Sequence, residues 1–229
     1  MTEPLLAIED LSVTVATDEG RAQIIDRADL VLHPGSIHGV VGESGCGKST
    51  LIKAVLGLLP KRATVDRGRI LFEGRDLLHL PRETMAREVR GRAIGFIPQD
   101  PFQALNPVFR VGDQMMELLR WHGLPGEPPP PGGRIDRATR ARHRAHLAAM
   151  LTAVQLADAE EALERYPHQF SGGQRQRLLI AAALACGPKV ILADEPTTAL
   201  DVTTQLQILK LLRELAGRFG LSMLFVTHD

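Results

Sequence analysis

The feature that most constrains the fold is a glycine-rich stretch between an apolar run and a helix-forming run. Residues 42 to 50 read Gly-Glu-Ser-Gly-Cys-Gly-Lys-Ser-Thr, in the pattern G-x-x-x-x-G-K-S/T, directly after the apolar residues Ile37 to Val41. Such glycines let backbone N–H groups converge on phosphate oxygens, and a helix opening near Lys48 adds its positive end. The stretch therefore predicts a phosphate loop in an α/β domain that binds a nucleoside triphosphate. A glycine-rich turn without a ligand is the alternative.

Each part of this loop has an expected place around ATP. Lys48 is placed to reach the β- and γ-phosphates, and Ser49 to hold Mg²⁺. The residues expected to bind ATP are Gly42, Glu43, Ser44, Gly45, Cys46, Gly47, Lys48, Ser49 and Thr50.

Composition and charge argue against several other classes of protein. The chain has 27 Lys and Arg against 27 Asp and Glu, so no overall field draws it to nucleic acid, and no nucleic-acid partner is expected. Its two cysteines, Cys46 and Cys186, supply no disulfide framework and suit a reducing compartment. Apolar runs of about 18 residues, the length of a spanning helix, do not occur. Any membrane association is therefore expected to be peripheral.

The strand patterns place the loop within a larger sheet. Residues 5–15 and 22–32 are β-rich and flank a turn at 17–20, and residues 70–72 read as another short strand. Three later runs are short and nearly continuously apolar, which suits parallel strands buried on both faces. These runs are Ala93 to Ile97, Val190 to Ala193 and Ser222 to Val226.

Helical patterns alternate with these strands. Apolar residues recur with helical spacing at 147–154 and 208–215, and residues 178–186 are apolar all round, which indicates a buried helix. The proline-rich stretch 127–133 separates two helical stretches as a surface insert. The arginine-rich stretch 134–146 is interpreted as a solvated helix face, with contact to acidic headgroups or a partner as the alternative.

A second element suited to phosphate chemistry is the pair of carboxylates that ends the run at 190–193. Alternation along an extended chain points Asp194 and Glu195 differently, so their jobs are expected to differ. Asp194 is expected to stabilise hydrated Mg²⁺, and Glu195 to accept a proton from the attacking water. Acids that only keep a strand end soluble are the alternative.

A third element, Ser171-Gly172-Gly173-Gln174, precedes a strong helix. A helix start with a serine and two unobstructed backbone N–H groups predicts a second anion site. A serine cap with a flexible glycine pair is the alternative. One nucleotide seldom needs two such sites from one chain.

These motifs, in this order, resemble those of the nucleotide-binding subunits of ABC transporters. The signature sequence matches Ser171, Gly172, Gly173 and Gln174, and the family's Q-loop, D-loop and switch histidine match Gln99, Ala199-Leu200-Asp201 and His228. The resemblance implies that Glu195, His228 and Gln99 are the catalytic residues. It implies that Ser49, Gln99 and Asp194 contact Mg²⁺, and that Asp201 is the D-loop residue.

The resemblance also implies the fold class, a P-loop NTPase (RecA-like) α/β core with an antiparallel β-subdomain and a helical signature subdomain. The expected division places the β-subdomain and phosphate-loop core at 1–99, the helical subdomain at about 100–175 and the rest of the core at 176–229. The chain stops one residue after His228, so a truncated C-terminal end is expected.

By the same resemblance, two ATPase subunits, identical or different, pair head to tail. ATP on the phosphate loop of one then meets Ser171 of the other. The other expected partners are membrane permease subunits and, indirectly, a substrate-binding protein, with the chain on the cytoplasmic face of the membrane. Apolar side chains after Gln99 offer a docking surface for the permease, with core packing as the alternative for each. They are Phe102, Leu105, Val108 and Phe109.

Finer features resemble the importers of dipeptides, oligopeptides and nickel. They are the stretch Gln99-Asp100-Pro101-Phe102-Gln103-Ala104-Leu105-Asn106-Pro107 and the stretch Tyr166-Pro167-His168-Gln169-Phe170. The expected function is Mg²⁺-dependent ATP hydrolysis that drives import of a small peptide or a nickel complex. The alternatives are a soluble ABC ATPase acting in nucleic-acid repair or translation, and a nucleotide-binding regulatory module without catalysis.

One departure from the family generates a prediction about base selectivity. Members of the family usually stack an aromatic ring on adenine, but no aromatic residue precedes Phe72, and Val15 lies near the expected place. Losing such stacking costs about 1–3 kcal/mol. We therefore expect GTP to compete with ATP almost equally in binding titrations. A strong preference for ATP would contradict this expectation.

Overall fold

An antiparallel sheet forms the N-terminal part of the chain. The computed structural model describes residues 3–228. β1 (Leu6–Thr17) and β2 (Gly20–Leu32) make a hairpin around a two-residue turn. β4 (Ala63–Phe72) pairs with the other edge of β1, and β5 (Arg75–Asp76) with β4, which gives the order β2-β1-β4-β5.

β4 corrects the prediction of a short strand at 70–72, because the strand begins at Ala63. Its first half is polar, and its charged side chains find partners across the sheet. Arg67 pairs with Asp10, and Asp66 accepts a hydrogen bond of 2.6 Å from Arg21. Ion pairs and backbone pairing with β1 thus extend the strand beyond the apolar stretch that the sequence pattern shows.

A parallel sheet forms the centre of the molecule. It contains β3 (Ile37–Val41), β6 (Ile94–Ile97), β7 (Val190–Asp194) and β8 (Ser222–Thr227) in the order β3-β8-β7-β6. Every residue of β7 is buried, as expected for a strand covered on both faces. Because the strands are parallel, the segments that follow their carboxyl ends lie along one edge of the sheet.

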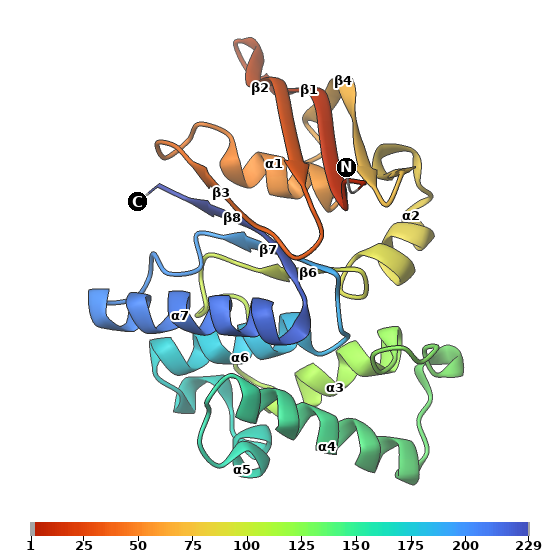
Figure 1. Cartoon of the computed structure of the whole chain (residues 1–229), viewed down its shortest axis with the longest axis vertical. Helices are drawn as coiled ribbons and strands as arrows, with labels where there is room; N and C mark the ends of the chain where they lie inside the picture. Colours follow the sequence, from red (N-terminus) through yellow and green to blue (C-terminus); the bar gives the residue numbers. More distant parts are fainter. Residues whose placement is uncertain (1–2, 229) are drawn as a thin grey trace.

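Helices cover the two faces of the parallel sheet (Figure 1). α1 (Lys48–Val55) packs between the parallel and antiparallel sheets, in one apolar cluster with Leu192 and Leu224. The opposite face, with Ile191 and Met223, packs on α6 (Gly172–Leu184) and α7 (Val202–Phe219). Alternation along β7 and β8 therefore divides their side chains between two cores.

A helical layer lies beyond α6, on the side away from the sheet (Figure 1). It is built from α3 (Val111–His122), α4 (Arg137–Ala153) and α5 (Ala159–Glu164). Shorter pieces complete the chain: a 3₁₀ turn at Leu77–His79, α2 (Arg82–Thr84), a π-helical turn at Met85–Val89, and 3₁₀ turns at Pro131–Gly133 and Pro167–Gln169. No helix within residues 3–228 is long and apolar enough to cross a membrane.

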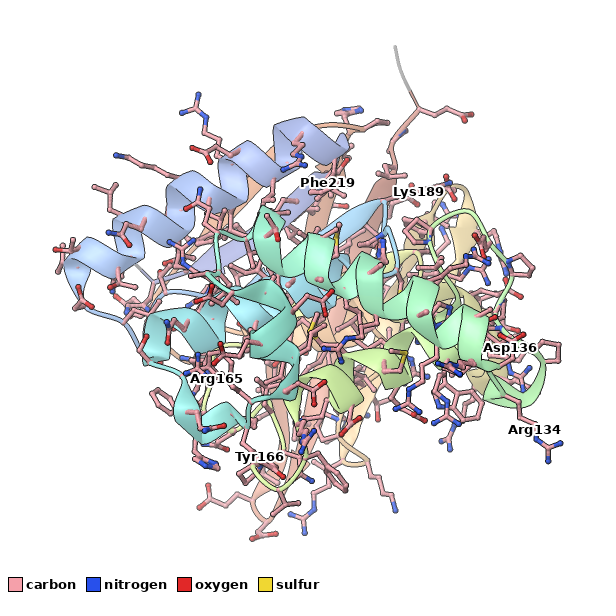
Figure 2. The ribbon with its side chains drawn as sticks, turned by 90° about the horizontal axis from the view of Figure 1, so that it is seen from below. Arg134, Asp136, Arg165, Tyr166, Lys189 and Phe219 are labelled. Carbon is pink, nitrogen blue, oxygen red and sulfur yellow. The ribbon has the colours of Figure 1, made fainter. Side chains whose placement is uncertain are left out.

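The arginine-rich stretch 134–146 is only in part a solvated helix face, because several of its side chains form ion pairs or are buried. Arg142 pairs with Glu127, and Arg144 pairs with Glu160 at 2.9 Å and with Glu164 at 2.5 Å. His143, between them, is buried. Figure 2 shows Arg134 at the edge of the molecule, just before α4. Carboxylates from neighbouring segments thus neutralise part of this stretch, which local sequence alone does not reveal.

The packing of β6 on α6 generates a stability prediction. A Cβ atom at Gly95 would lie 2.6 Å from the carbonyl oxygen of Ala183 and 2.6 Å from a methyl group of Ile191, whereas a Cβ at Gly39 of β3 would meet nothing within 4 Å. We expect Gly95→Ala to lower the free energy of unfolding by about 1–3 kcal/mol through overpacking. Gly39→Ala, the matched control, should leave it unchanged. Urea denaturation measures both, and equal effects would contradict the close approach.

Candidate functional site

The glycine-rich stretch forms the connection from β3 to α1, as its sequence predicts. Gly47 precedes α1 with φ 99°, and a Cβ at this position would lie 2.7 Å from the carbonyl oxygen of Ile24. The residue must therefore be glycine both for its backbone conformation and for space. Because α1 begins without a side-chain cap, its first N–H groups are available to an anion.

The ammonium group of Lys48 lies inside this loop. Its Nζ donates to the carbonyl oxygens of Gly42 at 2.7 Å and Glu43 at 2.8 Å. It also lies 3.7 Å from Oε1 of Glu195, and both side chains are buried, with 5% and 9% exposure. The loop thus holds a desolvated positive charge at its centre, which suits a phosphate group.

The Glu195 carboxylate collects hydrogen bonds from three separate segments. Oε2 accepts from Nε2 of Gln99 at 3.0 Å and from Oγ1 of Thr198 at 3.0 Å, and Nδ1 of His228 lies 2.9 Å away. The structure therefore brings together the three side chains predicted to be catalytic, Gln99, Glu195 and His228. Their parent segments follow β6, β7 and β8, whose ends meet because the strands are parallel.

The backbone of Glu195 corrects one step of the sequence argument. β7 ends at Asp194, and Glu195 has φ 43°, in the left-handed region. The two carboxylates point differently because the chain turns at Glu195, not because it continues as an extended strand. A non-glycine residue in this conformation carries backbone strain that the surrounding contacts must offset.

Asp194 faces the phosphate loop from the end of β7. Its Oδ1 accepts a hydrogen bond of 2.9 Å from the Ser49 hydroxyl. Burial raises the pKa of Asp194, the Ser49 hydrogen bond opposes this, and the neighbouring Glu195 adds to it. Two buried carboxylates therefore lie at the phosphate loop, where the charges of Lys48 and Lys53 partly offset the effect of burial on the pKa of Asp194. Their oxygens are ligands that suit a hard cation such as Mg²⁺.

The remaining predicted residues lie apart from this cluster or have local partners. Ser171 begins α6, where its Oγ accepts from the Gln174 N–H at 3.3 Å and Gln174 Oε1 accepts from the Ser171 N–H at 2.9 Å. This reciprocal pair is a capping box. Asp201 begins α7 and accepts from Thr204 N at 3.0 Å and Oγ1 at 2.7 Å. Both motifs therefore fix helix starts within this chain.

One contact of the site was not anticipated from the sequence. Thr198 contacts Glu195, and its only signal is its place three residues after the carboxylate. Of the four side chains for which permease docking and core packing were both open, Leu105 is 8% exposed and belongs to the core. Phe102, Val108 and Phe109 are exposed, at 51%, 69% and 54%.

Taken with the fold, this geometry defines a class. A parallel sheet with a phosphate loop after β3 and an acidic pair after β7 is the arrangement of a P-loop NTPase. Here an antiparallel sheet and a helical layer flank it.

The chain belongs to the ABC transporter family, whose sequence pattern matches residues 25–198. It is 42% identical over 228 residues to the dipeptide transport ATP-binding protein DppD of Bacillus subtilis, covering 99% of this chain and 64% of that protein. It is 41% identical over 226 residues to the oligopeptide transport ATP-binding protein OppD of Haemophilus influenzae, covering 99% and 65%. The chain thus spans slightly less than two thirds of the length of these relatives.

Solved structures show the same architecture. The ATP-binding cassette MJ0796, in a dimeric post-hydrolysis state bound to ADP and Pi, superimposes with a TM-score of 0.79. It is 28% identical, and the match covers 98% of this chain and 88% of that one. The predicted fold class and family are confirmed.

The raised pKa of Asp194 generates a prediction about pH and stability. The Asp194 carboxyl group binds its proton more tightly in the folded chain than in the unfolded chain. At pH values above the pKa of Asp194 in the folded chain, the ionised carboxylate therefore lowers the free energy of unfolding. The cost vanishes as pH falls below the ordinary aspartate pKa. Without nucleotide, Asp194→Asn keeps an acceptor for Ser49 and should raise the free energy of unfolding at pH 7, with a gain that shrinks toward pH 4.

Asp201→Asn is the matched control with the opposite sign. Hydrogen bonds from Thr204 lower the pKa of Asp201, so its ionised form stabilises the fold at neutral pH, and this stability is lost as pH falls. Urea denaturation from pH 4 to pH 8 compares the two variants. An Asp194→Asn variant less stable than the parent at pH 7 would contradict the charge balance described above.

Proposed function

We propose that this chain is the ATP-binding and ATP-hydrolysing part of an ABC importer that energises peptide uptake through a membrane permease. The observation that carries the proposal is the contact of Gln99, His228 and Lys48 with one buried carboxylate, Glu195, beside a phosphate loop. A general base, two polar groups and a phosphate-binding ammonium are the groups that hydrolysis of a γ-phosphate requires.

In this proposal the nucleotide lies along the loop 42–50 and over the start of α1. Lys48 binds the β- and γ-phosphates, and the N–H groups at the helix start bind their oxygens. Glu195 accepts the proton of the attacking water. Gln99 and His228, which already share that carboxylate, orient the water and the γ-phosphate. We also propose the subdomain boundaries given above: the β-subdomain and nucleotide-binding core at 1–99, the helical subdomain at about 100–175, and the rest of the core at 176–229.

Mg²⁺ fits the same site. Ser49 and Asp194 offer a hydroxyl and a carboxylate 2.9 Å apart, and these are oxygen ligands of the kind that Mg²⁺ takes. These two residues would hold the ion, with Gln99 near it, and the ion would neutralise charge on the β- and γ-phosphates.

We further propose that a second ATPase subunit completes the site. The signature residues Ser171, Gly172, Gly173 and Gln174, and Asp201 in the D-loop, would face ATP bound to that subunit. The dimeric state of the MJ0796 cassette supports this pairing. The partner would be identical or a related ATPase.

The proposed cargo is a dipeptide or oligopeptide rather than nickel, because the relatives quoted above are named for peptide transport. The permease would contact the exposed side chains of Val108 and Phe109, and conformational changes driven by ATP would reach it there. The chain would lie on the cytoplasmic face of the membrane. A substrate-binding protein would deliver the cargo without touching this chain.

The catalytic test is Glu195→Gln in the full-length protein assembled with its partner and permease. The amide cannot accept the proton, so we expect turnover to fall by about 100-fold or more, the range of a lost general base. ATP affinity should stay within a few-fold, because the phosphate loop keeps all its residues and Lys48 loses only its ion pair with Glu195. Phosphate release and ATP binding are the measurements.

Glu161→Gln, on the exposed surface of α5, is the matched control and should hydrolyse ATP at the parent rate. A Glu195→Gln variant with full turnover would show that another group activates the water. A parent complex without any turnover would instead support a regulatory module.

A further inference from the structure

The ring of Phe102 lies against the first turn of α6. The guanidinium carbon of Arg175 is 4.5 Å from the ring centroid, within the range of a cation–π contact. A Cβ atom built at Gly172 would lie 3.5 Å from the edge of the ring, so the ring also packs beside this glycine. One face of an otherwise exposed aromatic residue is therefore occupied by the signature helix.

Arg175 in turn holds the residues around Ser171. Its backbone N–H donates to the Ser171 carbonyl at 2.8 Å, and its Nε donates to the Phe170 carbonyl at 3.1 Å. The Arg175 side chain therefore holds the backbone immediately before the serine, and its backbone N–H closes the first helical turn on the serine itself.

Phe102 is also joined to the catalytic cluster through a tight turn. Asp100 Oδ1 accepts the Phe102 N–H at 2.7 Å, and Asp100 Oδ2 accepts from Gln103 Nε2 at 2.8 Å. Gln99, one residue earlier, donates to Glu195 at 3.0 Å. Two fixed contacts, one at each end of this short segment, therefore connect the buried carboxylate with the signature helix.

We infer that Phe102 is a positioning residue, which sets the place of Ser171 relative to Gln99 and Glu195 of the same chain. The inference rests on the proposed function, in which Ser171 contacts ATP on the second subunit. A movement of Gln99 when ATP binds would then pass through the 100–102 turn and the Arg175 contact to Ser171. Binding at one site would thereby improve the fit at the other, which is positive cooperativity.

The test compares Phe102→Leu with Phe102→Tyr in the full-length protein. Leucine keeps an apolar side chain but removes the aromatic face, whereas tyrosine keeps the face. For Phe102→Leu we expect ATP-dependent pairing of subunits to weaken by about two- to fivefold, the size of a half-exposed cation–π contact. The Hill coefficient of hydrolysis should fall, while ATP affinity of the unpaired subunit stays unchanged. Phe102→Tyr should behave as the parent.

Phe219→Leu is the matched control. This residue is 39% exposed, and its ring lies 5.4 Å from the guanidinium carbon of Arg218 at the far end of α7. The variant loses a similar contact away from the signature helix and should leave pairing and cooperativity unchanged. General loss of stability would affect both leucine variants.

A double-mutant cycle with Arg175→Gln completes the test. If the ring acts through the guanidinium, Phe102→Leu has no further effect in the Arg175→Gln background. Additive effects, a failure of Phe102→Tyr to restore pairing, or identical behaviour of the Phe102 and Phe219 variants would each overturn the inference while the parent still pairs and hydrolyses ATP. A parent that does neither would overturn the proposed function, and this inference with it.

Discussion

The structure of the site depends on holding the buried Glu195 carboxylate beside the buried ammonium group of Lys48. Removing two charges from water costs several kcal/mol for each, and the pair is tolerated only when further polar groups complete it. Gln99, Thr198 and His228 supply those groups. The fold must therefore bring four distant segments to one point, and this requirement explains the parallel order of the central sheet.

The sheet meets this requirement through strand direction. Parallel pairing aligns the ends of β3, β8, β7 and β6, so the phosphate loop, His228, Glu195 and Gln99 emerge at the same edge. The interior is apolar on both faces, which leaves the strand ends as the place where polar chemistry can be concentrated. The strain at Glu195, with φ 43°, lies at this edge, and the hydrogen bonds on its carboxylate hold it there.

The sequence was sufficient for those features in which local pattern and tertiary environment agree. Residues 190–193 of the buried strand β7 are a continuous apolar run, and the helix start at Lys48 follows from the glycines before it. Prediction failed where distant partners decide the outcome. The polar half of β4 is a strand because β1 pairs with it. For Leu105 the choice between docking and core packing stayed open, because its core partners lie far along the chain. Thr198 gave no signal beyond its place three residues after Glu195, because a threonine in a turn resembles any other until its neighbours are known.

The signature stretch shows how one motif can serve the fold and a ligand together. Within this chain Ser171 caps α6, and a Cβ atom at Gly173 would approach a Thr204 methyl group to 2.7 Å, so glycine there permits α6 to meet α7. Capping uses one lone pair of the serine oxygen and leaves its O–H free to donate. The interpretation as a helix cap and the interpretation as an anion site are therefore compatible. A capped first turn also has less freedom to move, which lowers the entropy lost when a phosphate binds there.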